Sequence, residues 1–210
     1  MVGQSLAAQG VTHEIVPPYF SVKEAVFPFI KFPGVDTILG PEMKSTGEVM
    51  GVGETFAEAF IKSQIAAGVR MPSSGNAFLS VRNEDKEKLV EIGRSLHELG
   101  FALVATRGTA AALSAAGIPV QVVNKVYEGQ PHIVDMIKND QIALVVNTPE
   151  EKRKAIQDSY SIRRSALQAR AATYTTMAGA KAAAVGLRNM KELVPYSLQS
   201  LQRRLNLNQG

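Results

Sequence analysis

The feature that most constrains the fold is a regular alternation of short apolar runs with helical segments, which begins near residue 77. The apolar runs occupy residues 77–81, 101–105, 120–123 and 142–146, and a last short run lies near 172–175. Helical spacing of apolar residues predicts helices after these runs, which end at Gly100 and Gly117 or span about 132–138, 149–170 and 177–187. Near-continuous apolar strands alternating with helices are typical of a parallel sheet that is covered on both faces. We therefore expect an α/β fold with a five-stranded parallel sheet sandwiched by helices.

The part of the chain before this alternation has a different composition. Residues 12–54 are rich in proline and glycine with scattered apolar residues, which predicts short strands and turns that are too small to close a core alone. A helix is expected from about Thr55, which can cap it together with Glu58. The predicted units are an amino-terminal α+β unit over 1–70, an α/β domain over 71–190 and a tail over 191–210. The tail is expected to form one amphipathic turn set and then fray; its apolar residues are Leu198, Leu201 and Leu205.

Composition argues against several classes of function. The chain has no cysteine, which excludes disulfides, thiolate metal sites and cysteine nucleophiles, and its three histidines lack the spacing of metal ligands. Its formal net charge of +4 is small and scattered, unlike the concentrated charge of a nucleic-acid binder. No apolar run approaches the roughly 20 residues of a membrane helix, and the start lacks a signal pattern. We expect a cytoplasmic protein that binds neither nucleic acid, nor a membrane, nor a metal.

Cationic and hydroxyl side chains follow the predicted strands, at the point where each strand ends. These side chains are Lys86, Thr106, Thr109, Lys125, Asn147 and Thr148. Because the carboxyl ends of parallel strands meet at one edge of the sheet, we expect these residues to lie close together. Gly108 would let the backbone at the start of the next helix approach a ligand, and helix amino termini favour anions. The pattern predicts a site for a phosphate or another compact anion, with Asn147 available to the sugar or base of a nucleotide.

The same residues also have a purely structural interpretation. Thr148 begins a good capping box in which Pro149 takes the first helical position. Thr106 and Thr109 can be helix caps in the same way. The two lysines can be solvated, or neutralised by the nearby acids Glu84, Asp85 and Glu128. The convergence of several such residues on one sheet edge favours the ligand site over the caps.

Candidates for catalysis are few. The sheet edge offers Glu128 and His132, and we interpret His132 as a structural residue at a helix start. The glycine-rich residues 47–53 lack the Lys-Ser/Thr of a phosphate-binding loop and do not match a dinucleotide fingerprint. We therefore expect no catalytic residue in this chain.

Longer motifs resemble one known family, the carbamoyl-phosphate synthase large subunits. Three amino-terminal stretches are similar to the region just after the ATP-grasp active site of the second synthetase half: PPYFSVKE at 17–24, FIKFPGVD at 29–36 and LGPEMKSTGEVMG at 39–51. Four later ones resemble the allosteric domain of the same subunit, which has a methylglyoxal-synthase-like fold: VNKV at 123–126, EG at 128–129, PHI at 131–133 and IRRSALQ at 162–168. Together the matches span nearly the whole chain and fade after about Arg188.

This resemblance implies the carboxyl-terminal piece of an enzyme that makes carbamoyl phosphate for arginine and pyrimidine synthesis. The substrates of that enzyme are bicarbonate, glutamine-derived ammonia and two ATP. Residues 1–70 would be the end of an ATP-grasp domain whose nucleotide- and magnesium-binding residues lie upstream, so this chain alone should not be catalytic. The resemblance implies ATP, magnesium (or manganese) and potassium as cofactors of the parent. Its partners would be the upstream domains and a glutamine amidotransferase small subunit, and a homo-oligomer is also allowed.

Within the family, the allosteric domain binds nucleotide monophosphates such as UMP and IMP. Matched motif by motif, the implied phosphate contacts are Lys86, Thr106, Thr109 and Lys125, and the nucleoside contacts are Asn147 and Thr148. Pro149 stands where bacterial relatives often carry a second threonine, which leaves the identity of the effector open. Relatives with an ornithine site place it between the two units, and Glu24 and Thr175 match two of its contacts.

Two alternatives stand beside the regulatory interpretation. An active methylglyoxal synthase would need carboxylates at two places that Gln130 and Thr148 occupy here, which argues against it. A module without a ligand would only join domains or subunits.

Overall fold

The computed structural model of the protein describes residues 3–14, 16–29, 47–149, 153–190 and 193–207. Its centre is a five-stranded sheet in the order β5-β4-β3-β6-β7, in which every neighbouring pair is parallel. The strands are β3 (Gly75–Ser80), β4 (Phe101–Thr106), β5 (Gln121–Val123), β6 (Ile142–Asn147) and β7 (Ala172–Tyr174). The five apolar runs of the sequence are these strands, so the expected α/β class and the five-stranded parallel sheet are confirmed.

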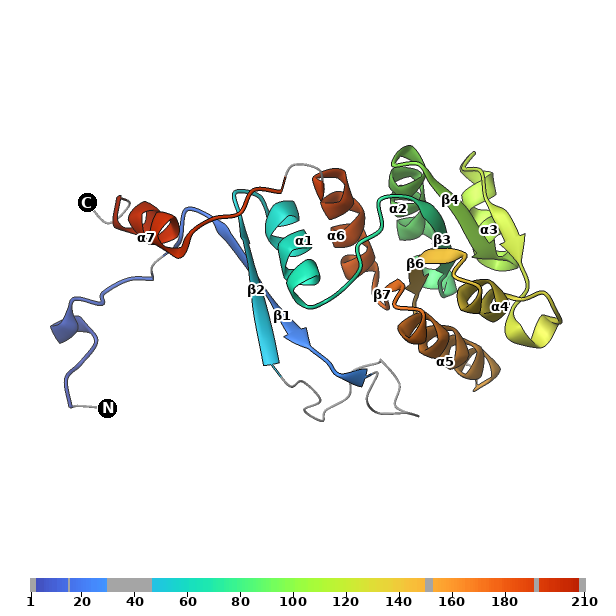
Figure 1. Ribbon diagram of the computed structural model, residues 1–210, viewed down its shortest axis with the longest axis horizontal. Coiled ribbons are helices and arrows are strands. Elements are labelled where there is room, and N and C mark those ends of the chain that lie inside the picture. Colours follow the sequence, from blue (N-terminus) through green and yellow to red (C-terminus); the bar gives the residue numbers. More distant parts are fainter. Residues whose placement is uncertain (1–2, 15, 30–46, 150–152, 191–192, 208–210) are drawn as a thin grey trace.

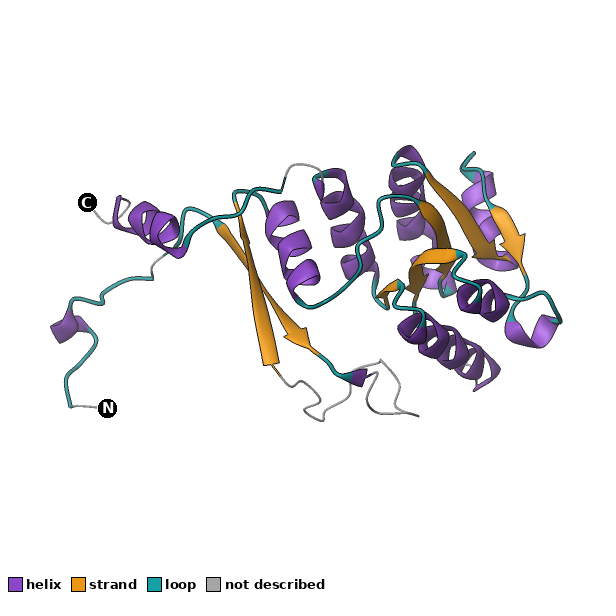
Figure 2. Ribbon diagram, in the orientation of Figure 1, coloured by secondary structure: helices purple, strands orange, loops and turns teal. Residues whose placement is uncertain are grey.

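Helices cover both faces of this sheet (Figure 2). They are α2 (Lys86–Glu98), α3 (Arg107–Ala115), α4 (Ile133–Lys138), α5 (Arg153–Gln168) and α6 (Met177–Arg188). Helices α2, α3 and α6 share one apolar core with Ala77 and Leu79, whereas α4 and α5 share a second core with Phe78. Because successive residues of a strand point to opposite faces, a strand that is covered on both sides must be apolar throughout. This is why Ala77, Phe78 and Leu79 of β3 are all apolar and buried.

A hairpin and one helix precede the sheet, and we call β1, β2 and α1 the hairpin unit. Strands β1 (Phe20–Val26) and β2 (Gly47–Gly53) are antiparallel, and α1 (Phe56–Ala66) packs on β2. The packing requires glycine, since a Cβ on Gly51 would lie 2.0 Å from the carbonyl oxygen of Ala59. The expected cap of α1 is confirmed, because the Thr55 hydroxyl accepts a hydrogen bond from the Glu58 N–H at 3.2 Å.

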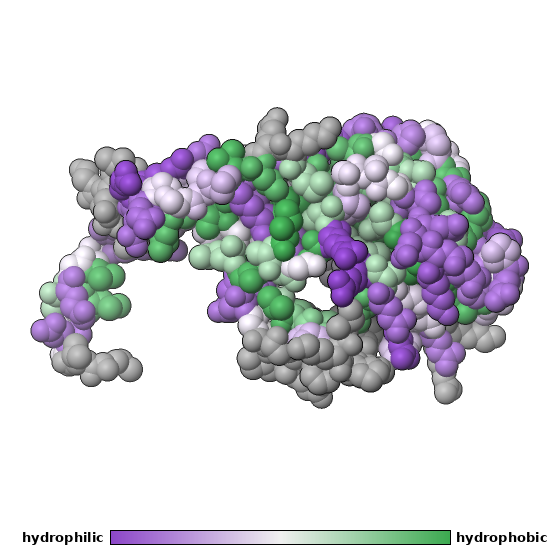
Figure 3. All heavy atoms as spheres, in the orientation of Figure 1, coloured by the Kyte–Doolittle hydropathy of each residue, from purple (hydrophilic) through white to green (hydrophobic). Residues whose placement is uncertain are grey.

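The hairpin unit meets the α/β sandwich through α1 and α6, which lie side by side between the hairpin and the sheet (Figure 1). Phe60 and Ile61 of α1 belong to the same apolar core as β3 and α6. The helices cross closely, since a Cβ on Gly186 would lie 2.4 Å from Cγ1 of Ile61. On the face shown in Figure 3, hydrophobic side chains gather around α1 and the hairpin, while the sandwich is mostly hydrophilic.

Two expectations about helices differ from the structure in their extent. Helix α5 is described from Arg153 rather than from about residue 149, and residues 150–152 lie outside the described ranges. The tail forms a helix of 10 residues, α7 (Leu198–Leu207), where the sequence favoured one turn set that frays. Leu201 of α7 is buried and Leu198 is exposed. Within the described ranges, no helix combines the length and the apolar character needed to cross a bilayer. Short 3-10 helices occur at Ala7–Gln9, Asn83–Asp85 and Val126–Glu128.

Candidate functional site

The carboxyl edge of the sheet holds a network of buried polar side chains around Ser80, the last residue of the central strand. The Ser80 hydroxyl lies 3.1 Å from the Thr106 hydroxyl at the end of β4. The Ser80 carbonyl accepts hydrogen bonds from Asn147 Nδ2 and from the Thr148 N–H, each at 3.3 Å. The ends of β3, β4 and β6 are thus tied together by side chains. Sequence reasoning missed Ser80, although a polar residue closing an apolar run was a usable signal.

The predicted threonines and the asparagine belong to this network, and each is at most 3% exposed. The Thr109 hydroxyl accepts the Val81 N–H at 3.2 Å and lies 3.4 Å from the Thr106 hydroxyl. The Thr148 hydroxyl accepts the Arg82 N–H at 3.0 Å. Thr106 occupies the cap position of α3, but its side chain makes no capping bond there. The hydroxyls therefore brace the loop after β3. The predicted capping-box partner of Thr148 is Glu151, which lies outside the described residues.

Arg163 completes the network from the second layer of the structure. Its side chain is 1% exposed, and its Nη1 donates a hydrogen bond to Asn147 Oδ1 at 3.2 Å. Both ends of the Asn147 amide are thereby engaged, because Nδ2 donates to Ser80. Sequence reasoning did not assign Arg163 to the site. The available signal was a charged residue on the buried stripe of α5, next to Ile162 and three residues before Ala166.

Lys86 brings positive charge to the rim above these buried groups. Its ammonium lies over Gly108 in the first turn of α3. A Cβ added at Gly108 would lie 3.1 Å from Lys86 Nζ. Glu84 and Asp85, the acids that could neutralise Lys86, lie near Arg82 instead. Arg82 Nε lies 2.8 Å from Asp85 Oδ2 and 3.8 Å from Glu84 Oε2. In the part of the chain that the structure describes, Lys86 forms no ion pair.

Lys125 follows β5, one strand beyond β4 in the sheet. Its backbone N–H donates to Glu128 Oε2 at 2.8 Å, so this carboxylate caps its own turn, and the Lys125 ammonium lies 6.0 Å from the centroid of the Tyr127 ring. His132 caps α4, and its N–H donates to Asp135 Oδ2 at 3.0 Å, which agrees with a structural residue at a helix start. Because all five strands are parallel, Lys86 and Lys125 both belong to the carboxyl edge of the sheet.

A cavity lies between the hairpin unit and the sandwich, and both predicted ornithine contacts line it. This cavity of about 480 Å³ has Glu24 and Gln64 on the side of the hairpin unit and Arg163, Arg170 and Thr175 on the side of the sandwich. Burial raises the pKa of the Glu24 carboxyl above its usual value, against the lowering effect of a hydrogen bond with Gln64. The cavity therefore combines one carboxyl group with guanidinium groups and a hydroxyl.

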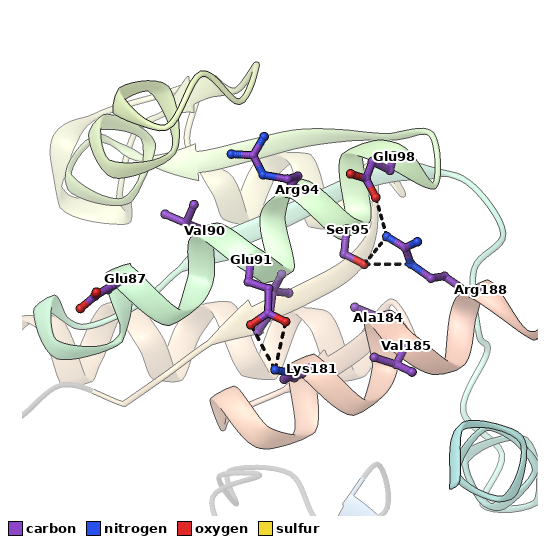
Figure 4. A pocket seen from close by; sticks show the side chains of 11 residues that line it. Glu87, Val90, Glu91, Arg94, Ser95, Glu98, Lys181, Ala184, Val185 and Arg188 are labelled. Carbon is purple, nitrogen blue, oxygen red and sulfur yellow. Dashed lines mark hydrogen bonds and ion pairs between the residues drawn. The ribbon is translucent and has the colours of Figure 1, made fainter. Parts of the chain in front are cut away.

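A groove of about 610 Å³ runs between α2 and α6 (Figure 4). Four of its charged side chains form two pairs: Lys181 Nζ lies 3.0 Å from Glu91 Oε1, and Arg188 Nη2 lies 2.5 Å from Glu98 Oε2. These contacts join the two helices across the groove. In the described ranges, histidine and acidic side chains form no cluster of three or more that could hold a metal ion.

The sandwich is similar to a known family of domains. Residues 88–175 match the family model of the MGS-like domain. Over 205 residues the chain is 60% identical to the carbamoyl phosphate synthase large chain of Ralstonia nicotianae and 56% identical to that of Pasteurella multocida. Each match covers 98% of this chain and 19% of the relative. The large chain of Pseudomonas aeruginosa is 57% identical over 201 residues, with 96% and 19% covered.

These matches confirm the resemblance to the carbamoyl phosphate synthase large chain that the sequence motifs indicated. The chain spans about one fifth of the length of these relatives, since 19% of each is covered. The MGS-like match begins within α2 and ends at Thr175, just after β7. Five of the six strand-end residues therefore fall inside it, namely Thr106, Thr109, Lys125, Asn147 and Thr148, whereas Lys86 lies just before it.

Proposed function

We propose that this chain is the regulatory part of a carbamoyl phosphate synthase large chain and binds a phosphate-bearing effector, such as UMP or IMP, at the carboxyl edge of its sheet. The observation that carries the proposal is the position of the Lys86 ammonium. It lies over Gly108 at the start of α3, without a carboxylate partner among the described residues. A cation held at a helix amino terminus is a suitable place for a dianion, because the first-turn N–H groups and the helix dipole add to its charge.

The phosphate would be held by Lys86, by Lys125 and by the first turn of α3, where Arg107 and Gly108 are exposed. The hydroxyls of Thr106 and Thr109 lie directly beneath this turn and are braced by Ser80 and Val81. A site whose donors are already fixed by other hydrogen bonds loses little conformational entropy on binding. We therefore assign the phosphate to this rim.

The nucleoside would lie toward Asn147 and Thr148 at the end of β6. Asn147 Nδ2 carries two hydrogens, and one of them is donated to Ser80. The second can serve a sugar or base. Pro149, next in the chain, has no N–H to donate, so the nucleoside end has fewer donors than the phosphate end. On this proposal, the phosphate supplies most of the affinity and is shared by different effectors.

The activity of the whole enzyme is a further part of the proposal. The parent would synthesise carbamoyl phosphate with ATP, magnesium or manganese and potassium, together with a glutamine amidotransferase small subunit. The chain of 210 residues would not catalyse that synthesis alone. Bicarbonate-dependent ATP hydrolysis by the purified chain is the measurement that checks this statement, and sustained turnover would contradict it.

The test of the effector site is calorimetric titration of the chain with UMP, IMP and inorganic phosphate. Lys86→Met should weaken all three ligands by roughly 10- to 150-fold, since a charge-assisted hydrogen bond contributes about 1.5–3 kcal/mol. Lys88→Met is the matched control, because Lys88 is exposed on the same helix and loses the same charge. Lys125→Ala should weaken the same ligands. An equal loss in the Lys86 and Lys88 variants would refute a specific site.

The same titration separates the alternatives. Methylglyoxal formation from dihydroxyacetone phosphate would support a methylglyoxal synthase. At the two places where that enzyme would need carboxylates, however, this chain has Gln130 and Thr148. Gln130 is exposed, and the Thr148 hydroxyl accepts the Arg82 N–H. No binding of any of the three ligands would support a module that only joins domains or subunits.

A second ligand, ornithine, is proposed for the cavity between the hairpin unit and the sandwich. The Glu24 carboxylate can pair with an ammonium group, and the guanidinium group of Arg170 suits a carboxylate. Titration with L-ornithine should show binding that Glu24→Gln and Thr175→Val both weaken. Unchanged affinity in both variants would remove the cavity from the proposal.

A further inference from the structure

The carboxyl-terminal segment returns from the end of α6 to the hairpin unit, where α7 lies far from the five-stranded sheet (Figure 1). We call residues 194–204 the strap. The strap lies outside residues 88–175 of the MGS-like domain, and it contacts α1 and Glu54, which lies between β2 and α1. It therefore joins the last part of the chain to the hairpin unit, although the whole sandwich lies between them in the sequence.

Lys62 of α1 is the centre of this contact. Its ammonium donates to the Val52 carbonyl at 3.0 Å, to Glu58 Oε1 at 2.8 Å and to the Val194 carbonyl of the strap. A lysine ammonium has three hydrogens, so the strap supplies one of its three acceptors. The ring of Tyr196 adds a cation–π contact, with Nζ 4.0 Å from the ring centroid. Only 18% of the Lys62 side chain is exposed, so loss of these partners would leave a poorly solvated charge.

The strap makes further polar contacts and one apolar contact. The Tyr196 hydroxyl donates to Glu58 Oε2 at 3.3 Å, and the same carboxylate oxygen accepts the Glu54 N–H at 2.9 Å. Arg204 lies 5.3 Å from the Tyr196 ring centroid and 3.0 Å from Glu54 Oε1. Leu201 is buried. Glu58 and Lys62 are one helical turn apart and so present one side of α1 to the strap, while Ala57 and Ile61 face α6 at Gly186.

From these contacts we infer that the strap fastens α1 and the hairpin to the sandwich, and so fixes the two walls of the cavity of about 480 Å³ relative to each other. Helix α1 is the shared element. It packs on α6 through Ile61, it supports β2 through the close approach at Gly51, and the strap holds it through Lys62. One wall of the cavity belongs to the hairpin unit and the other to the sandwich. If α1 is held less firmly, the distance between the two walls becomes larger or more variable. The device is a conformational lock made by the carboxyl-terminal segment.

Amide hydrogen exchange tests the lock in the chain of 210 residues. Tyr196→Ala removes the ring over Lys62 and should raise exchange in α1 and β2 by about tenfold, since a desolvated cation–π contact contributes on the order of 1–2 kcal/mol. Tyr196→Phe keeps the ring and should raise it by less, about two- to fivefold. Leu198→Ala is the matched control, because Leu198 is 68% exposed on α7 and should change exchange by less than twofold.

Strand β4 of the sandwich is the internal reference. A chain that ends at Leu193 should show fast exchange in α1, β1 and β2 with little change in β4, and a synthetic peptide of residues 194–207 should restore slow exchange when added. Exchange like that of the full chain after truncation would overturn the inference. A rise of equal size in β4 would overturn it too, because the strap would then support the whole fold rather than the hairpin unit.

Discussion

The first prediction concerns Gly108→Ala, a substitution that should stabilise the fold and weaken ligand binding at the proposed effector site. Gly108 is exposed in the first turn of α3, and its backbone does not need a positive φ. Alanine is favoured over glycine within a helix by about 0.5–1 kcal/mol. The melting temperature should therefore rise, by about 2–4 °C for each kcal/mol in a protein of this size.

The same methyl group would intrude on Lys86. A Cβ at residue 108 would lie 3.1 Å from Lys86 Nζ, which is closer than ordinary contact. The flexible end of the lysine can move away by a few tenths of an ångström, but the ammonium then leaves the place where it faces the first-turn N–H groups. Because a charge-assisted hydrogen bond contributes about 1.5–3 kcal/mol, a partial loss should weaken inorganic phosphate by roughly three- to tenfold. Isothermal titration calorimetry measures this change, and a thermal melt measures the stability.

A double-mutant cycle makes the reasoning refutable. If the methyl group acts through Lys86, then Gly108→Ala should cost no further phosphate affinity in a chain that already carries Lys86→Met. An additional loss of the same size in that background would show that the methyl group acts elsewhere. Phosphate affinity equal to the wild type in the single variant would refute the proposed position of the ammonium.

The remaining predictions concern the hairpin unit, the buried network and the cavity. Gly51→Ala places a methyl group 2.0 Å from a backbone carbonyl of α1 and should destabilise the chain by more than about 2 kcal/mol in urea denaturation, whereas Gly47→Ala in the same strand meets nothing within 4 Å and should be nearly neutral. Arg163→Met removes a buried hydrogen bond to the end of β6 and should cost about 1–3 kcal/mol, while Arg164→Met, at an exposed site, should stay within about 0.5 kcal/mol. Burial raises the pKa of the Glu24 carboxyl, so L-ornithine affinity should fall as the pH drops through that raised pKa, and calorimetry of Glu24→Gln should show no such dependence.

Much of the sandwich could be predicted because its signals are local. The apolar runs became strands, since a parallel sheet buried on both faces needs continuous apolar segments. The positions of Lys86, Thr106 and Asn147 at one sheet edge followed from strand direction alone. Their hydrogen bonds could not be predicted in the same way. The Asn147 amide is engaged by Arg163, 16 residues further along the chain on a helix of the other layer, and only the packing of α5 brings the two together.

The strap shows the limit of local reasoning more sharply. Tyr196 and Glu58 are 138 residues apart, and neither carries a motif that points to the other. The sequence around Leu198 and Leu201 predicted weak amphipathic character, which is compatible with a frayed end and with a docked helix. In the structure the helix is docked, because Leu201 is buried and Arg204 lies 3.0 Å from Glu54 Oε1.

In the proposed anion site, the buried network and the rim cations would have different roles. Thr109 and Thr148 accept backbone N–H groups of the loop after β3, from Val81 and Arg82, so these hydroxyls set where the loop and the following Lys86 begin. Buried hydroxyls that are already engaged give little new interaction energy to a ligand, but they hold the lysine that does. Replacement of Thr109 should consequently weaken phosphate binding through the position of Lys86. The loss should then shrink when Lys86 is itself replaced, a coupling that a hydroxyl in direct contact with the phosphate would not show.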